Sequence, residues 1–237
     1  MKHLQIFLLA AILSSSSLTY AQELYVETGK TLSFFDYTNS QGQALDNLQE
    51  SPHSFLEVGY RDQFLTKKLY ASLGASYAGY GAIGSDDTVG NFMQWNVNYA
   101  TLKLALEHNL FTVQKFSFYV KASYSLGFLV QGTQTLNNRV FNLKNEDDFE
   151  KTLINYGYGA GIMRPISEKM SVYLQYMYRK SEALKEGTAN TADQETLKIV
   201  SRNLSIGLIL NISSKKKVKK EKKIKPVIKN QQPTTKS

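Results

Sequence analysis

Residues 116–131 read FSFYVKASYSLGFLVQ and alternate between two kinds of side chain. The odd positions are mostly small or polar: Ser117, Tyr119, Lys121, Ser123, Ser125, Gly127, Leu129 and Gln131. The even positions are apolar or aromatic: Phe116, Phe118, Val120, Ala122, Tyr124, Leu126, Phe128 and Val130. A strand sends successive side chains to opposite faces, whereas the 3.6-residue period of a helix would mix the two sets. This segment is therefore predicted to be a strand whose two faces meet different surroundings.

The same two-residue period predicts seven more strands. Six of them are regular and lie near residues 24–35, 55–64, 69–82, 153–164, 170–179 and in a segment that ends with 204–212. In the seventh, 93–106, the odd positions are apolar up to Tyr99 and the even positions are apolar from Leu102 onward. We expect a β-bulge at Ala100-Thr101 to restore the facing; a shorter strand preceded by a loop is the alternative.

The segments between these strands alternate in length. Residues 65–68, 110–115 and 166–169 are short, whereas 36–54, 83–92, 132–152 and 180–196 are long and polar. Short turns on one side and long loops on the other are typical of transmembrane β-barrels, whose short turns face the periplasm. We therefore expect both chain ends to lie on the periplasmic side.

The N-terminal residues predict export. Lys2 precedes the apolar run 4–13, and Thr19-Tyr20-Ala21 places small residues at the −3 and −1 positions of a signal-peptide cleavage site after Ala21. The run is too short to span a bilayer as a helix, and no later segment resembles a transmembrane helix. The chain has no Cys, so no lipid anchor, disulfide or thiolate metal site is expected. No cofactor is expected either.

The formal charge of +8 comes almost wholly from the C-terminal segment. Residues 213–237 hold ten of the 28 Lys and Arg residues and one of the 20 Asp and Glu residues. With Lys2 assigned to the signal peptide, the body keeps 17 basic and 19 acidic residues. A nearly neutral body gives no reason to expect nucleic-acid binding.

A membrane barrel and a soluble secreted barrel or sandwich both explain the alternation, because a lipocalin-like barrel also alternates, with its apolar face inside. Here the polar faces carry mostly Ser, Asn, Gln, Gly and Tyr, where a water-exposed face would carry more Lys and Glu. The strands are also long enough to cross a bilayer, and Tyr and Phe lie near their ends. We therefore predict an all-β, eight-stranded antiparallel up-and-down transmembrane β-barrel over residues 22–212.

This architecture resembles the small outer-membrane β-barrel proteins of Gram-negative bacteria, the OmpA-like and OmpX-like group. The resemblance covers about residues 23–212 and concerns architecture, since no family motif is matched residue by residue. It implies an outer-membrane location. Many such proteins end at the last strand with an aromatic residue, whereas here the strand ends near Ile212 and a tail follows.

Four charged residues fall on the predicted polar faces: Glu57, Arg61, Lys121 and Arg179. If those faces line the lumen, the charges must be paired there. An ion-pair network that plugs the interior is favoured over a gated ion path, because eight strands leave room only for side chains.

A lipid hydrolase would need Ser, His and an acid within reach of one another. His53 is expected in the first long loop, and His108 follows Glu107 at the end of a strand. Adjacent strand residues point to opposite faces, so Glu107 cannot orient His108. The acidic pairs and triplets at 86–87 and 146–148 could hold Ca²⁺, but their spacing fits no known loop and solvated acidic loops are favoured.

The C-terminal segment is predicted to be a disordered periplasmic tail. Its basic block comprises Lys215, Lys216, Lys217, Lys219, Lys220, Lys222 and Lys223. One hypothesis is a tether to peptidoglycan or to a periplasmic or outer-membrane protein; the alternative is a solubilising tail without a fixed partner. The other expected partners are outer-membrane lipid and lipopolysaccharide.

The leading functional expectation is a non-enzymatic outer-membrane barrel with an envelope-structural or surface-interaction role carried by four external loops. The alternatives are a narrow channel or accessory subunit of a transport or secretion complex, and a membrane-embedded lipid hydrolase.

Overall fold

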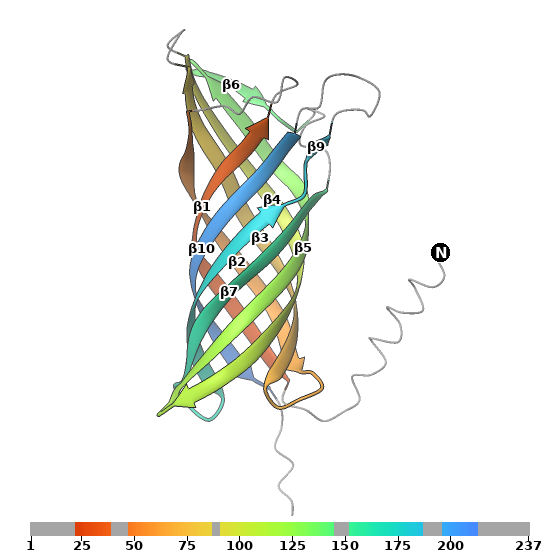
Figure 1. The fold of residues 1–237 in the computed structure, drawn as a ribbon, viewed down its shortest axis with the longest axis vertical. Coiled ribbons are helices and arrows are strands. Elements are labelled where there is room, and N and C mark those ends of the chain that lie inside the picture. The colour runs from red at the N-terminus through yellow and green to blue at the C-terminus, as the bar shows by residue number, and fades with distance from the viewer. Residues whose placement is uncertain (1–21, 39–46, 87–90, 145–151, 187–195, 213–237) are drawn as a thin grey trace, which may run out of the picture.

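The computed structural model describes residues 22–38, 47–86, 91–144, 152–186 and 196–212. Ten strands lie in these ranges (Figure 1). No helix in the described ranges is long and apolar enough to cross a membrane. Eight strands form a ring: β1 (Glu23–Thr38), β2 (Leu48–Gln63), β3 (Leu69–Asp86), β4 (Asn91–Val113), β5 (Phe116–Leu136), β7 (Leu153–Pro165), β8 (Met170–Ser181) and β10 (Thr196–Asn211). The short strands β6 (Arg139–Asn142) and β9 (Lys185–Glu186) pair with β5 and β10.

The ring closes by pairing its first strand with its last. β1 and β10 run antiparallel from the pair Glu23 and Asn211 to the pair Thr38 and Thr196. The remaining neighbours in the ring follow one another in chain order, and each neighbouring pair is antiparallel. No edge strand is left in the wall, so all backbone groups along it can pair. The predicted eight-stranded up-and-down barrel is confirmed.

The two ends of the barrel differ. At the turn end, short turns at 64–68, 114–115 and 166–169 join the strands, and β1 starts there as β10 ends. At the loop end, the strands continue beyond the predicted limits, so much of the expected loops 36–54, 83–92 and 132–152 is strand. β5 and β6 form a hairpin there through Asn137 and Asn138, both with positive φ, as a tight two-residue turn requires.

The predicted bulge at Ala100-Thr101 is wrong. Pairing between β3 and β4 runs without a break from Asn91 to His108, and Val97, Tyr99 and Lys103 all face the lumen. The apolar pattern changes phase because the lumen itself changes character, from charged near the turn end to apolar near the loop end. The register between β4 and β5 does shift nearby, at Asn98/Tyr99, but the unpaired residue there is Val130 of β5, so the facing of β4 does not change. A second shift lies at Asn109/Phe111.

A bulge does occur in β2, where the sequence predicted a loop. Pairing between β2 and β3 shifts between Glu50 and Phe55, around Pro52, which has no N–H to donate to the ladder. The Ser33 hydroxyl of β1 substitutes for the missing ladder bonds: it accepts from Gly81 N at 2.8 Å and donates to Gly81 O at 2.9 Å. His53 therefore lies in a strand and not in the first loop.

The outer wall is apolar. Leu204, Ile206, Leu208 and Leu210 of β10 are each about half exposed, and the other seven strands carry similar outward rows. In water such a surface would be unstable, but it suits the lipid-facing side of a membrane barrel.

Candidate functional site

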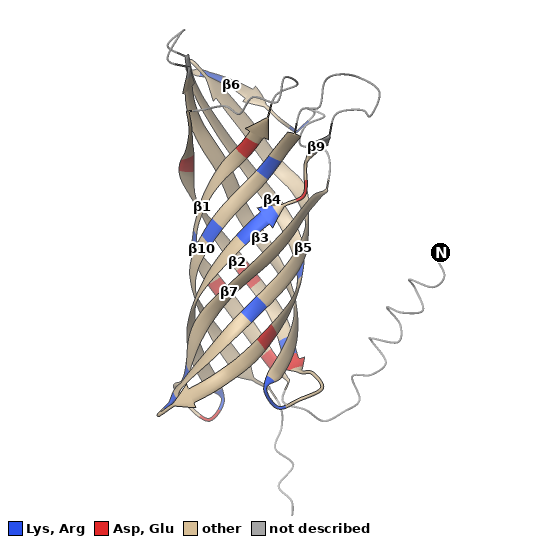
Figure 2. Ribbon diagram, viewed as in Figure 1, with Lys and Arg blue, Asp and Glu red and all other residues tan. Residues whose placement is uncertain are grey.

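The half of the lumen near the turn end holds a charged layer. Four cations and four carboxylates point inward from five strands, and all but Glu23 are buried. Figure 2 marks the positions of the charged residues along the strands. The charged layer comprises Glu23, Glu27, Glu57, Arg61, Lys103, Glu107, Lys121 and Arg179. Its formal charge is zero, as a low-dielectric interior requires of a stable set of charges.

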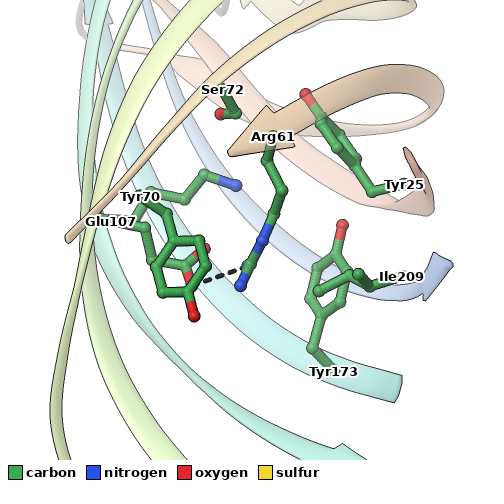
Figure 3. Close-up of a pocket in the computed structure, with 8 residues that line it drawn as sticks. Tyr25, Arg61, Tyr70, Ser72, Glu107, Tyr173 and Ile209 are labelled. Atoms are coloured by element: carbon green, nitrogen blue, oxygen red, sulfur yellow. Dashed lines mark hydrogen bonds and ion pairs between the residues drawn. The ribbon is translucent and has the colours of Figure 1, made fainter. Parts of the chain in front are cut away.

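Arg61 of β2 joins two carboxylates at the bottom of the charged layer. Its Nε donates to Glu23 Oε2 at 2.6 Å and its Nη1 donates to Glu107 Oε1 at 2.8 Å. The guanidinium carbon also lies 4.2 Å from the ring centre of Tyr70 (Figure 3). The enclosed space beside Arg61 is about 10 Å³, about enough for one water molecule.

Glu57 of β2 forms the second ion pair. Lys103 Nζ of β4 donates to its Oε2 at 2.5 Å, and the Tyr25 hydroxyl donates to its Oε1 at 2.7 Å. The pair spans β3, whose Gly74 and Ser76 leave room for the side chains to meet. Both side chains are at most 3% exposed, so water does not solvate the two charges. The stability of the pair therefore depends on its direct contact and hydrogen bonds.

Glu27 of β1 is held by neutral donors. Gln175 Nε2 and the Ser205 hydroxyl donate to its Oε1 at 2.7 and 2.8 Å, and the Tyr173 hydroxyl donates to its Oε2 at 2.9 Å. Gln175 in turn accepts from the Tyr119 hydroxyl and from Lys121 Nζ through its own oxygen. Gln175 thus connects the cation on β5 to the carboxylate on β1.

All four charged residues expected in the lumen face it, but they do not pair with one another. Glu57 pairs with Lys103, and Arg61 pairs with Glu23 and Glu107. Lys121 contacts Gln175 at 3.4 Å and lies 5.7 Å from the ring centre of Tyr25. Arg179 lies 5.8 Å from the Phe55 ring centre, and its Nε and Nη2 are buried without a hydrogen-bond partner among the described residues.

Sequence reasoning missed half of the charged layer. The missed residues are Glu23, Glu27, Lys103 and Glu107. Each of them lies at a position whose side chain points inward, on the face opposite the apolar row of its strand. A full count of the charges at these alternate positions would have found them. The alternation cannot predict which residue each charge contacts, because the contacts depend on the register between strands.

Glycines make room for the tyrosines of the lumen. A Cβ on Gly207 would lie 2.2 Å from Tyr173 Cζ, and one on Gly161 would lie 2.3 Å from Tyr119 Cζ. Tyr25 likewise occupies the space that a side chain on Gly59 or Gly74 would fill. The rings thus extend over glycines of neighbouring strands, and their hydroxyls bond to Glu57, Gln175 and Glu27.

An apolar layer fills the lumen above the charged layer. It comprises Phe35, Phe55, Ala78, Tyr80, Ala82, Val97, Tyr99, Leu143, Leu153, Leu184, Leu197 and Ile199, each at most 6% exposed. Tyr80 and Tyr99 meet edge to face, with ring centres 6.1 Å apart. The lumen therefore carries two consecutive side-chain layers, one polar and one apolar.

The residues expected to serve a hydrolase or a metal do not assemble. His53 points into the lumen beside Gly79 and Gly81, whereas His108 faces outward, on the opposite face from Glu107. No group of three or more His, Cys, Asp or Glu suited to a metal lies within the described ranges. The acidic residues 87 and 146–148, the predicted signal peptide and the Lys-rich tail lie outside the described residues.

Several solved structures are similar to the chain at low sequence identity. Solved structures similar to the chain include Neisserial surface protein A, with 14% identity over 79% of this chain and 96% of that one and a TM-score of 0.45. OprG from Pseudomonas aeruginosa shows 11% identity over 81% and 97%, with a TM-score of 0.45. Ail from Yersinia pestis, in complex with the heparin analogue sucrose octasulfate, shows 12% identity over 80% and 99%, with a TM-score of 0.39.

A comparison with curated proteins finds no match. The family model described as outer membrane protein beta-barrel domain matches residues 6–208, which is most of the chain. The chain therefore belongs to the outer membrane protein beta-barrel domain family, and its place is the bacterial outer membrane.

Proposed function

We propose that this protein is a sealed, non-enzymatic outer-membrane barrel that holds an external rim for surface interaction. The filled lumen is the observation that carries the proposal. A solute would have to pass the ion pairs of Arg61 and Glu57 and then the packed rings of Tyr80 and Tyr99. Breaking buried ion pairs for each passage would cost several kcal/mol.

The loop end supplies the surface for the proposed interaction. The hairpin of β5 and β6 extends the wall there, and Val140 and Phe141 of β6 are 67% and 47% exposed. Because short turns face the periplasm in this class of barrel, the loop end faces outward from the cell. Exposed apolar residues on this hairpin are suited to binding another molecule.

Conductance measurements test the sealed barrel against the alternative of a narrow channel. The full chain is inserted into planar bilayers, and a porin inserted in the same way serves as the positive control. We expect no stable current steps from this protein. Reproducible steps would contradict the proposal and support a transport role.

The non-enzymatic part of the proposal rests on the separation of the two histidines. His53 faces the lumen and His108 faces lipid, so they cannot share a substrate. The test is phospholipid and lipid A hydrolysis by the reconstituted protein and by its His53→Ala and His108→Ala variants. Hydrolysis that either substitution abolishes would overturn this part.

We further propose that the Lys-rich tail tethers the barrel to peptidoglycan or a periplasmic partner. β10 ends at Asn211 at the turn end, and short turns face the periplasm in this class of barrel, so the tail would begin on the periplasmic side. Ten lysines would attract the carboxylates of peptidoglycan. Deleting residues 214–237 is expected to reduce cosedimentation with isolated sacculi, and unchanged cosedimentation would support a tail that only solubilises.

A further inference from the structure

The outer wall is apolar but carries a one-sided row of cations. Going up from the turn end, the first charged residue that faces outward is Lys30 on β1, Lys180 on β8 and Arg202 on β10. These three strands are neighbours in the ring. Within the described parts of β4 and β5, by contrast, the charged residues Lys103, Glu107 and Lys121 face the lumen.

Strand register makes these cations contiguous. Lys30 pairs with Leu204 and Arg202 pairs with Leu32, so Lys30 and Arg202 are diagonal neighbours on the same face. Arg202 and Lys180 are diagonal neighbours in the same way, because their partners are Tyr178 and Val200. Diagonal neighbours lie roughly 7–8 Å apart, so one polyatomic anion can touch two of them.

Lys198 extends this row, which we call the outer basic row: Lys30, Arg202, Lys180 and Lys198. Lys180 and Lys198 line an open hollow of about 350 Å³ at the loop-end termini of β8 and β10. Ser181, Glu182, Ala183 and Thr196 complete its lining. The hollow is wide enough for a phosphate group and lies between two cations.

The carboxylates nearby neutralise the outer basic row only in part. Asp36 lies 3.4 Å from Lys180, and Glu50 lies 3.2 Å from Arg202. Glu182 accepts a hydrogen bond from the Tyr156 hydroxyl. Lys30 contacts the Ser54 hydroxyl at 3.0 Å, and neither Lys30 nor Lys198 forms an ion pair with a described residue.

The position of the row selects the kind of anion. The ten residues from Arg202 to Asn211 match the length of a tilted strand that crosses the bilayer, and between them the outward side chains Leu204, Ile206, Leu208 and Leu210 are apolar. The row therefore lies at the boundary between acyl chains and head groups, at the loop end. Lys30 is the lowest member, with Leu32 above it, and its flexible stem lets the ammonium reach the polar zone.

We propose that the outer basic row binds the phosphate groups of a phosphorylated glycolipid in the external leaflet. The acyl chains of that lipid would lie along the apolar rows of β1, β8 and β10.

The test measures lipid binding to the full chain folded in a zwitterionic detergent. The probe is bisphosphorylated lipid A, and binding is followed by native mass spectrometry. The variant Lys30→Gln/Lys180→Gln/Lys198→Gln/Arg202→Gln removes the row. The matched control, Lys67→Gln/Lys68→Gln/Lys115→Gln/Lys169→Gln, removes four exposed cations at the turn end.

We expect the row variant to bind lipid A more weakly by about fivefold for each cation removed, and the control to bind as the parent does. The same glycolipid without phosphates is expected to bind the parent weakly. Equal losses in both variants, or equal binding of the dephosphorylated lipid, would overturn the proposal. Displacement of lipid A by equimolar inorganic phosphate would also overturn it, because the site would then recognise the free ion.

Folding of each variant is checked by its faster electrophoretic migration when unboiled. Should the fourfold variant fail this check, the double variant Lys180→Gln/Lys198→Gln is used instead. It removes only the two cations that line the hollow and leaves the ion pair of Arg202 and Glu50 intact. Parental affinity of that folded double variant would contradict the assignment of the hollow.

Discussion

Lys103 of β4 and Glu57 of β2 meet across an intervening strand, with Lys103 Nζ 2.5 Å from Glu57 Oε2. Strands β2 and β4 share no backbone hydrogen bonds, because β3 lies between them. The contact can form only when three strands are in register and the side chains between them are small. It therefore reports on the correct assembly of this part of the wall.

Removing one partner of this pair should destabilise the barrel strongly. Lys103→Met leaves Glu57 charged and buried, so the free energy of unfolding should fall by about 3–5 kcal/mol. Urea unfolding in vesicles, followed by the fluorescence of Trp95, the single Trp of the chain, measures this change. Adding Glu57→Gln should recover part of the loss, whereas Lys67→Met at an exposed turn should cost little; equal losses in the single and double variants would contradict the pairing.

The packing of Tyr173 over Gly207 predicts a coupled pair of substitutions. Gly207→Ala places a methyl group 2.2 Å from Tyr173 Cζ and should cost about 1–3 kcal/mol of unfolding free energy. In a Tyr173→Leu background the same alanine should cost much less, because the ring is gone. A double-mutant cycle on the unfolding free energy checks this, and additive costs would show that the ring does not restrict the site.

The hydrogen bonds between the Ser33 hydroxyl and Gly81 should contribute more to the free energy of unfolding than the small size of the side chain suggests. Ser33→Ala leaves the N–H and C=O of Gly81 without this partner inside the barrel, which should cost about 1–3 kcal/mol. Ser117→Ala, at the turn end, removes a hydroxyl bonded to Thr112 near water and should change stability by about 0.5 kcal/mol or less. Similar losses at the two serines would contradict the role given to Ser33.

Opening the apolar layer should not open the barrel. Tyr80→Ala/Tyr99→Ala removes two packed rings and should lower the unfolding free energy by several kcal/mol. Bilayer recordings should nevertheless stay silent, because the ion pairs of Arg61 and Glu57 still fill the lumen below. Steady current through this variant would show that the apolar layer alone seals the barrel.

The fold could be predicted from sequence because two-residue alternation survives wherever the two faces differ. The prediction failed at Val97 and Tyr99, where the lumen is as apolar as the lipid and the alternation gives no information about facing. It failed again at Pro52 and His53, since a bulge bridged by a distant serine has no local signature. The predicted strands are too short at the loop end, because the polar sequence of a strand beyond the membrane resembles that of a loop.

The charged layer shows the same division. Parity places Glu57, Arg61, Lys121 and Arg179 in the lumen, and they do lie there. Their contacts could not be predicted, because a side chain such as Lys103 chooses its partner through the tilt and register of three strands. The outer basic row was missed for a related reason: Lys30, Lys180 and Arg202 are far apart in sequence and become neighbours only through pairing.

The seam between β1 and β10 has a consequence for how the protein is made. Glu27 depends on Tyr173, Gln175 and Ser205, which lie 146, 148 and 178 residues further along the chain. A partly inserted wall would expose this carboxylate without its donors in a medium that cannot solvate it. Half-built intermediates within the bilayer are therefore penalised, and productive biogenesis has to deliver the final strands before, or together with, insertion of the first.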